Sequence, residues 1–382
     1  MSVYSKQEVS NPPDTKAELQ RLTDSLVNYF HTQMNVIEGG LFLKVVSPKG
    51  EYLVSSGISP VVAENSHFRI ASNTKTFTAA AIMLLHQEGK LNVDYYITGT
   101  FTGTNVTYLP ETADYDLPFK SQITIKMLLQ HRAGVFDVTN TGIPITINKP
   151  YAGQIYPQYV RRLPGQNFHT FTFDELTGIV SANNLYYFVP GQDFHYSNTG
   201  YNVLGKIIER ASGMSYSDFI TTRFIKPLQL SNTTSVWEGT DITIPSLEIK
   251  SYLNLDKTDS NTTEDNMSAH VAEGNLISTP DDLAKWIKLL INGQAGVSSA
   301  NVALMEMVLP VGGVIGTYGL GLVYDEGLGY GHDGGHLSYI SFMRYNPEND
   351  ITIVMLFNFI NDVNAEDIKL AEFALRVVNV CK

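Results

Sequence analysis

Cysteine is almost absent from this chain of 382 residues, since a single one, Cys381, stands beside the C-terminus. An intramolecular disulfide, a metal site built on cysteine thiolates and a thiol nucleophile in the body of the chain are therefore excluded. An excess of basic residues is also lacking, because 26 Lys and Arg face 38 Asp and Glu, a formal net charge of −12. Since phosphate binding needs a basic footprint, we expect neither nucleic acid nor an anionic membrane as a partner.

Long hydrophobic runs are missing as well, and none approaches the roughly 18 residues that span a bilayer. The first 20 residues are polar and include Pro12, Pro13 and Asp14, so they lack the apolar core of a signal peptide. We therefore expect no integral membrane segment. The expected compartment is periplasmic or extracellular if a signal peptide has been removed, and cytoplasmic otherwise.

Hydrophobic residues make up 43% of the chain and charged residues 17%, which is typical of a folded globular protein with a substantial core. The length corresponds to two or three domains, or to one large domain with an insertion. Amphipathic helical patterns predict helices over residues 15–34 and 364–378. Strands are predicted near both ends of the chain, over residues 40–46, 52–56, 319–324, 338–345 and 351–357.

This order of elements predicts an α+β fold, in which the two chain ends form one antiparallel sheet flanked by helices. We expect one lobe from residues 1–90 and 311–382, and a second, helix- and loop-rich lobe from residues 91–310. Clefts between lobes are preferred ligand sites. Reactive residues near the lobe boundaries are therefore the candidates for an active site in the cleft.

The first candidate is the stretch from Ser72 to Lys75, which begins an apolar helical pattern that ends at Gly89. Three residues apart on one helix face, the Lys75 amine and the Ser72 hydroxyl come within reach of each other. Burial lowers the pKa of an amine, so Lys75 could be the base that activates Ser72. The alternative is structural, with Ser72 as a helix N-cap and the Lys75 amine extending to the surface.

The second candidate is Tyr196-Ser197-Asn198, in a loop that precedes a predicted helix. Beside a lysine ammonium, the Tyr196 phenol would lose its proton at reduced cost. The Asn198 amide can both donate to and accept from a substrate amide. The alternative is again structural, a turn followed by a helix cap.

The third candidate is the glycine-rich stretch 329–336, which precedes a predicted strand and would let a substrate backbone pair closely with it. His332, Asp333 and His336 could instead ligate a metal, but strand alternation directs such neighbours to different faces and a fourth ligand is lacking. A dinucleotide-binding loop would need a strand followed by a helix, which the surroundings do not predict. We therefore expect neither a metal nor an organic cofactor.

Taken in order, Ser72-x-x-Lys75, Tyr196-x-Asn198 and His332-x-Gly334 resemble the three active-site motifs of the serine β-lactamase and penicillin-binding protein superfamily. The first and second motifs begin 124 residues apart and the second and third 136 residues apart. This spacing is similar to that of the class C β-lactamase and D-alanyl-D-alanine carboxypeptidase branch. Framework stretches that also resemble this branch cover residues 84–91, 123–134, 225–228 and 274–283.

The resemblance implies a serine hydrolase in which Ser72 attacks a carbonyl and forms an acyl-enzyme. Lys75 and Tyr196 would handle the protons, and His332 would take the place that a lysine fills in many β-lactamases. The backbone N–H groups of Ser72 and Gly335 would form the oxyanion hole. The implied substrate-binding residues are Asn198, Asp333, Gly334 and Gly335.

Asp333 departs from the family pattern, because the penicillin-recognising members usually have a hydroxyl residue at this place. A carboxylate facing the cleft would repel the free C-terminal carboxylate shared by penicillins and D-alanyl-D-alanine peptides. The alternative is that Asp333 points away from the cleft, as every second residue of a strand does.

The expected function is hydrolysis by a D-specific peptidase or amidase, or by a D-alanyl-D-alanine carboxypeptidase-like penicillin-binding enzyme. The expected partner is a small peptide, amide, ester or β-lactam substrate. A β-lactamase or a carboxylic esterase on the same scaffold is one alternative. A non-catalytic scaffold protein of the penicillin-binding type is another.

Overall fold

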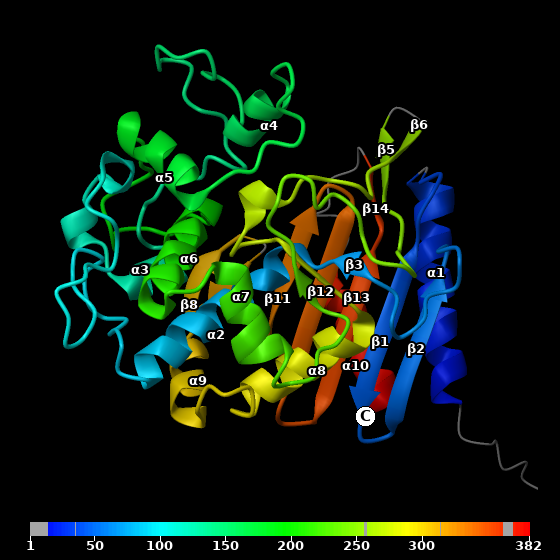
Figure 1. The fold of residues 1–382 in the computed structure, drawn as a ribbon. Helices are drawn as coiled ribbons and strands as arrows, with labels where there is room; N and C mark the ends of the chain where they lie inside the picture. The colour runs from blue at the N-terminus through cyan, green and yellow to red at the C-terminus, as the bar shows by residue number, and fades with distance from the viewer. Residues whose placement is uncertain (1–13, 35, 256–257, 314, 362–369) are drawn as a thin grey trace, which may run out of the picture.

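The computed structural model describes residues 14–34, 36–255, 258–313, 315–361 and 370–382 (Figure 1). The helices are α1 (Thr15–Gln33), α2 (Thr74–Gln87), α3 (Ile125–Leu129), α4 (Tyr156–Arg161), α5 (Phe173–Ala182), α6 (Asn198–Ser212), α7 (Tyr216–Ile220), α8 (Pro280–Ile291), α9 (Ser299–Met305) and α10 (Leu370–Cys381). The strands of the main sheet are β1 (Leu41–Ser47), β2 (Gly50–Ser56), β10 (Val323–Asp325), β11 (Gly329–His336), β12 (Tyr339–Asn346) and β13 (Ile351–Phe357). The shorter strands are β3 (Phe68–Arg69), β4 (Thr234–Ser235), β5 (Tyr252–Leu255), β6 (Thr258–Asn261), β7 (Leu276–Ser278), β8 (Leu309–Gly312), β9 (Gly316–Tyr318) and β14 (Phe359–Asn361).

The main sheet joins the two halves of the chain, because its six strands follow the order β10-β11-β12-β13-β1-β2. Every neighbouring pair is antiparallel, and Leu41 of β1 lies opposite Phe357 of β13. In Figure 1 the blue strands β1 and β2 accordingly lie beside the orange and red strands β12 and β13. The expected α+β fold, with one antiparallel sheet built from both chain ends, is confirmed.

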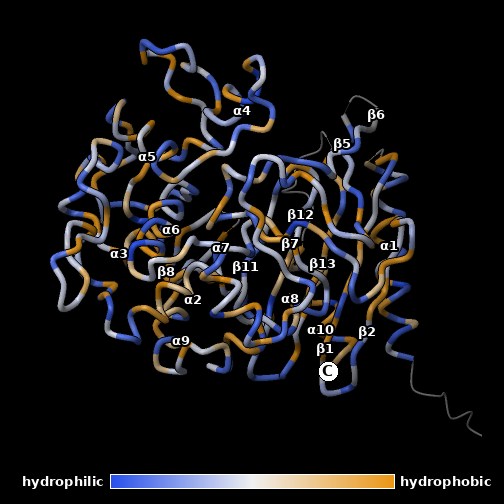
Figure 2. Tube along the Cα trace, viewed as in Figure 1, coloured by the Kyte–Doolittle hydropathy of each residue, from blue (hydrophilic) through white to orange (hydrophobic). Residues whose placement is uncertain are grey.

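The two faces of the sheet are covered by different helices, because side chains alternate along each strand. Phe42 and Val354 belong to the hydrophobic cluster that includes α2 and α8. Leu43, Phe342 and Met355 belong to the cluster that includes α1 and α10. Hydrophilic and hydrophobic residues are mixed along α1, as expected for a helix with one buried face (Figure 2). The sheet is thus the central layer between two helical layers.

Helix α2 lies at the centre of the molecule, and every residue from Thr74 to Leu85 is buried. It packs against α6, α7 and α9 and also contacts β11 of the main sheet. A helix that is buried all round can hold a polar side chain in a water-poor environment, so α2 is suited to position reactive groups.

The predicted strand over residues 319–324 is interrupted in the structure. Strand β9 ends at Tyr318 and β10 begins at Val323. Gly321 between them has a φ of 73°, a left-handed conformation that ends a strand. The predicted C-terminal helix begins at Leu370 in the described part of the chain, and its expected first residues, 364–369, lie outside the described residues. No helix in the described ranges is long and apolar enough to cross a membrane.

Candidate active site

Ser72 lies in a 3-10 turn, Ala71–Asn73, that connects β3 to α2. Ala71 has a φ of 47°, which is uncommon for a residue with a side chain and typical of constrained functional turns. The turn is tied to strand β12, because the Asn73 amide donates to Ser341 Oγ at 2.8 Å and Ser341 Oγ donates to the Ile70 carbonyl at 2.9 Å. The N-cap of α2 is Asn73, so the Ser72 hydroxyl is free of a capping role.

The Lys75 amine lies beside Ser72 and is completely buried. Its Nζ is 3.1 Å from Ser72 Oγ, 2.7 Å from Asn198 Oδ1 and 2.9 Å from the carbonyl oxygen of Glu273. Burial lowers the pKa of Lys75, and the Glu273 carboxylate opposes this effect. A neutral amine here would donate its two N–H groups to Asn198 and Glu273. Its lone pair would then be directed at the Ser72 hydroxyl, ready to accept a proton.

Tyr196 covers the Lys75 amine, with 4.7 Å between Nζ and the centre of the phenol ring. Burial raises the pKa of Tyr196 well above its ordinary value, and the nearby Ser72 hydroxyl opposes the increase, although the phenol oxygen meets no partner at hydrogen-bonding geometry among the described residues. The expectation that the neighbouring ammonium makes Tyr196 easy to deprotonate is therefore corrected, because loss of solvation outweighs that effect. Tyr196 is a protonated phenol in the resting site.

Asn198 is the first residue of α6 and forms three hydrogen bonds. Its Oδ1 accepts from Lys75 at 2.7 Å, and its Nδ2 donates to Thr139 Oγ1 at 3.0 Å. Its backbone N–H donates to Asp137 Oδ2 at 3.2 Å. Burial raises the pKa of Asp137, although hydrogen bonds from Thr139 oppose this. The Asn198 side chain therefore positions Lys75 and has one remaining N–H for a substrate.

Strand β11 passes directly behind the Ser72 turn. A Cβ atom on Gly334 would lie 2.4 Å from both the Ile70 carbonyl oxygen and Ser341 Oγ, so only glycine allows this approach. Gly334 thus has a packing role, and its expected close pairing with a substrate stays a prediction. Strand β10 pairs with β11 as far as Gly331, and within the described ranges no strand covers the outer edge of residues 332–336. This edge is open to a substrate beside Gly335.

His332 points toward α2, and both of its ring nitrogens are occupied. Nε2 lies 2.8 Å from the Tyr318 hydroxyl, and Nδ1 lies 2.5 Å from the backbone carbonyl oxygen of Asp333. Burial, helped by the positive charge of Lys75, lowers the pKa of His332 to about 3. His332 is therefore an uncharged imidazole at neutral pH.

The Asp333 side chain lies on the opposite face of β11 from His332. In the antiparallel register Asp333 is opposite Phe342, which belongs to the cluster under α1 and α10. Its carboxylate forms an ion pair with Arg344, 2.9 Å from Oδ1 to Nη1. Of the two expectations for Asp333, the structure shows the side chain that turns away. Because Arg344 offsets its charge, the expected repulsion of substrate carboxylates has no support in the geometry.

Glu273 is a site residue that the sequence reasoning missed. It is fully buried, with Oε2 at 3.3 Å from Lys75 Nζ and Oε1 at 2.5 Å from His270 Nδ1. Burial raises the pKa of Glu273, but the charges of Lys75 and His270 more than offset this, so the net shift is downward. In the sequence, Glu273 is a lone carboxylate that follows the apolar residues Val271 and Ala272. This pattern was the feature that could have marked Glu273 as a buried functional residue.

The alternative of a metal at the end of β11 does not match the positions of the side chains. His336 Nε2 lies 2.8 Å from Asp265 Oδ2, and Asp265 also pairs with Arg161. His332 and Asp333 have the separate partners described above. Within the described ranges no three His, Cys, Asp or Glu side chains are arranged to hold a metal ion.

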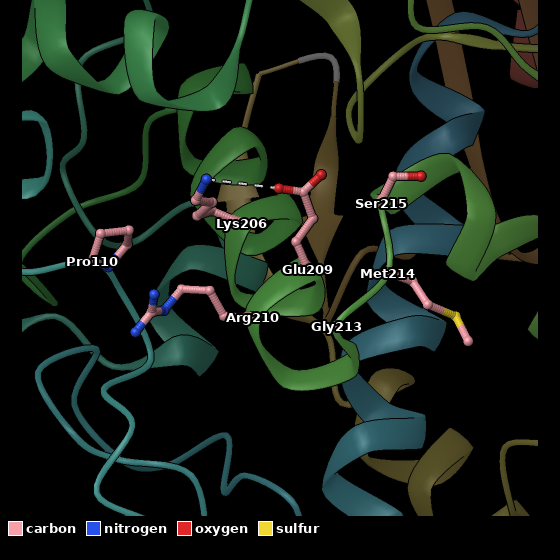
Figure 3. A pocket seen from close by; sticks show the side chains of 7 residues that line it. All are labelled: Pro110, Lys206, Glu209, Arg210, Gly213, Met214 and Ser215. Atoms are coloured by element: carbon pink, nitrogen blue, oxygen red, sulfur yellow. Dashed lines mark ion pairs between the residues drawn. The ribbon is translucent and has the colours of Figure 1, made fainter.

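A surface hollow of about 400 Å³ lies at the C-terminal end of α6, whereas Asn198 is at the N-terminal end (Figure 3). Lys206, Glu209 and Arg210 line it, but the two cations have protein partners. Lys206 pairs with Asp174 at 2.8 Å, and Arg210 donates to the Thr107 carbonyl at 2.8 Å. This hollow is separate from the Ser72 site.

Known proteins resemble this chain over most of its length. A family model described as Beta-lactamase matches residues 44–375. Protein flp from Staphylococcus aureus (strain N315) is 27% identical over 307 residues, which cover 76% of this chain and 52% of that protein. The chain spans about half, or less, of the length of the curated relatives it matches.

Two solved structures share the fold over nearly the whole chain. The D-amino acid amidase from Ochrobactrum anthropi SV3, complexed with L-phenylalanine, is 26% identical with a TM-score of 0.74, covering 96% of this chain and 98% of that chain. The D-stereospecific amidohydrolase from a Streptomyces species is 23% identical with a TM-score of 0.73, covering 91% and 95%. The second likeness concerns the fold alone.

Proposed function

This chain belongs to the Beta-lactamase family, and from that premise we propose that it is a serine amidase acting on amides of D-amino acids. The observation that carries the proposal is the buried Lys75 amine, 3.1 Å from the Ser72 hydroxyl, with its other N–H groups held by Asn198 and Glu273. A serine needs such a base to attack an amide carbonyl at neutral pH.

In the first half of the reaction, Lys75 would accept the Ser72 proton as Oγ bonds to the substrate carbonyl carbon. The negative oxygen of the tetrahedral intermediate would be stabilised by the backbone N–H groups of Ser72 and Gly335. Tyr196 would donate its proton to the leaving nitrogen as the C–N bond breaks, and regain one from the Lys75 ammonium. Ammonia leaves, and the acyl group remains on Ser72.

In the second half, water would attack the acyl carbon and give one proton to the same base. The bond between Ser72 Oγ and the carbonyl carbon then breaks, and Oγ takes up the proton held by Lys75. The D-amino acid leaves and the resting site is restored. Because Lys75 and Tyr196 return to their starting protonation states, the cycle consumes only water and substrate.

The charges around Ser72 favour a leaving group without a carboxylate. The Lys75 amine is hydrogen-bonded to Asn198 and to the Glu273 carbonyl oxygen. The low pKa of His332 leaves its imidazole uncharged. Arg344 is paired with Asp333 on the far face of the sheet. Lys75, His332 and Arg344 therefore offer no free positive charge to a leaving-group carboxylate, and His270, whose pKa is raised, is paired with Glu273. A simple amide fits this environment better than a penicillin or a D-alanyl-D-alanine peptide. The preference for the D configuration is carried over from the amidase that this chain resembles.

Four phenylalanine derivatives, three of which share the D-phenylalanyl group, test the proposal. We expect kcat/KM for D-phenylalaninamide to exceed that for L-phenylalaninamide by about a hundredfold or more, as for a site that reads hydrogen-bond geometry. D-phenylalanyl-D-alanine, which ends in a carboxylate, should also be a poor substrate. Hydrolysis of D-phenylalanine methyl ester alone would identify an esterase instead. Preference for D-phenylalanyl-D-alanine would contradict the proposal and favour a carboxypeptidase.

The pH dependence should change when Glu273 is replaced by glutamine. Glu273 stabilises the charged form of Lys75, so its removal lowers the pKa of Lys75 further. The neutral base is then present at lower pH, and the acid limb of the kcat/KM profile should move to lower pH. Glu264→Gln, at an exposed carboxylate outside the site, is the matched control and should leave the limb in place. A shift to higher pH in Glu273→Gln would contradict the assignment of Lys75 as the base.

A further inference from the structure

The Glu273 carboxylate is shared by two basic side chains, Lys75 and His270. Its Oε2 lies 3.3 Å from Lys75 Nζ, and its Oε1 lies 2.5 Å from His270 Nδ1. The Glu273 side chain is only 3% exposed, so water screens neither contact effectively. One carboxylate carries one negative charge and cannot neutralise two protonated partners. The protonation of either base therefore affects that of the other.

A tight turn holds His270 and Glu273 in this arrangement. The His270 carbonyl oxygen accepts from the backbone N–H of Glu273 at 3.1 Å and from that of Gly274 at 2.8 Å. A Cβ atom on Gly274 would lie 3.6 Å from the His270 Cβ and 3.8 Å from the carbonyl carbon of Ala71. The turn thus packs directly against the 3-10 turn that carries Ser72, and His270 is a fixed part of the surroundings of the site.

His270 is better placed than Lys75 to carry the positive charge. Its contact with the carboxylate is shorter, and its side chain is 15% exposed, whereas that of Lys75 is 0% exposed. Burial lowers the pKa of His270, but the Glu273 carboxylate more than offsets this, so the net shift is upward. For Lys75, burial outweighs the effect of the same carboxylate, and the pKa is lowered.

The other titratable groups around His270 leave Glu273 as its direct partner. They are His336, Asp265 and Asp137. The His336 ring lies 4.7 Å from the His270 ring, and burial lowers the pKa of His336, so that ring is uncharged at neutral pH. Asp265 already forms an ion pair with Arg161. Asp137 accepts from the Thr139 hydroxyl and forms no hydrogen bond with His270 within the described ranges.

We propose that His270 is a positioning residue for Lys75. As a cation, it takes up part of the charge of Glu273 and thereby lets Lys75 act as a base at lower pH. The inference rests on the proposed role of Lys75 and adds a second residue that adjusts it. Glu273 stabilises the charged form of Lys75, and a charged His270 weakens that stabilisation. Replacing Glu273 and replacing His270 should therefore have opposite effects on Lys75.

The first test replaces His270 with asparagine, whose side-chain N–H can donate to Glu273 without carrying a charge. The readout is the rate at which a fluorophosphonate labels Ser72 between pH 5 and pH 10, a step in which Lys75 takes the Ser72 proton as fluoride leaves. In His270→Asn the acid limb of this profile should move to higher pH by about one unit. In Glu273→Gln it should move to lower pH. In the double variant, His270→Asn should add nothing to the effect of Glu273→Gln, because the carboxylate that couples the two bases is gone.

His169→Gln is the matched control. His169 Nε2 also pairs with a glutamate, Glu175, at 2.8 Å, but Glu175 is bonded to Tyr156 rather than to Lys75. The acid limb of this variant should coincide with that of the wild type. A limb that stays in place or moves to lower pH in His270→Asn overturns the inference. An equal shift with and without Glu273→Gln also overturns it, because His270 would then not act through the carboxylate.

A second measurement requires no reaction at Ser72. In wild-type protein with ¹⁵N-labelled histidine, assigned with a His270→Gln variant, His270 should titrate above about 6.5, the ordinary value for histidine. In Glu273→Gln the same signals should titrate at lower pH than in the wild type. Titration at or below about 6.5 in the wild type contradicts the inference even if His270→Asn does not fold. If D-phenylalaninamide is not hydrolysed but the labelling profiles shift as expected, the proposed function fails and the role of His270 stands.

Discussion

Replacing Ser72 with alanine is expected to reduce kcat/KM for an activated ester or amide by on the order of 10⁴-fold or more. Alanine removes the oxygen that forms the acyl-enzyme, and Lys75 and Tyr196 then have no nucleophile to serve. The fold should survive, because the turn around Ser72 is held by Asn73 and Ser341 rather than by the Ser72 hydroxyl. Thermal unfolding should therefore occur close to the wild-type temperature.

A covalent probe tests directly whether Ser72 is the nucleophile. Wild-type protein treated with a fluorophosphonate should gain one adduct, located on Ser72 by mass spectrometry, and Ser72→Ala should gain none. Ser121→Ala, at an exposed serine remote from α2, is the matched control and should react like the wild type. Near wild-type hydrolysis by Ser72→Ala would show that Ser72 is not the nucleophile.

Replacing Lys75 with arginine is expected to reduce kcat/KM by about 10²- to 10⁴-fold, the usual contribution of a general base. Arginine keeps the positive charge next to Glu273 but does not lose its proton at neutral pH, so it separates the role of the base from the role of the charge. The remaining activity should rise steadily with pH as hydroxide replaces the missing base. The measurement is kcat/KM between pH 6 and 10.

Lys44→Arg is the matched control for this substitution. Lys44 is a second buried lysine, on β1, with its amine paired to carboxylates that include Asp281 at 2.6 Å. It is remote from Ser72 and should tolerate arginine without loss of activity. Full activity in Lys75→Arg would contradict the assigned base and indicate that Tyr196 acts on the Ser72 proton alone.

Local patterns were sufficient to predict the elements that carry the site. The hairpin of β1 and β2 around Pro48, the strand β13 and the N-terminal helix were all readable, because alternating or helical periodicity and turn residues act over a few neighbours. The same reasoning predicted that the Lys75 amine lies close to the Ser72 hydroxyl, because residues three apart share a helix face, and the structure has this contact. The division into two lobes at residues 90 and 310 stays a prediction.

Long-range burial, by contrast, could not be read from the sequence. The expectation that the Tyr196 phenol loses its proton at reduced cost was wrong, because the sequence does not show how completely a side chain loses water. Glu273 reaches Lys75 across 198 residues, and its place in an apolar stretch marks it as unusual without identifying that partner. Strand alternation allows the Asp333 side chain to point to either face of the sheet. The register of β11 with β12 places it on the face where it pairs with Arg344.

Residue types and short spacings specify the chemical groups of this protein and their order, from Ser72 and Lys75 through Tyr196 to His332. The charge states of those groups follow only from the three-dimensional fold. A pKa depends on the water excluded and the charges brought near by residues distant in the chain, as Lys75 is brought to His332. Reactive residues can therefore be recognised from short stretches of sequence, whereas the charge of the substrate that they accept depends on the fold.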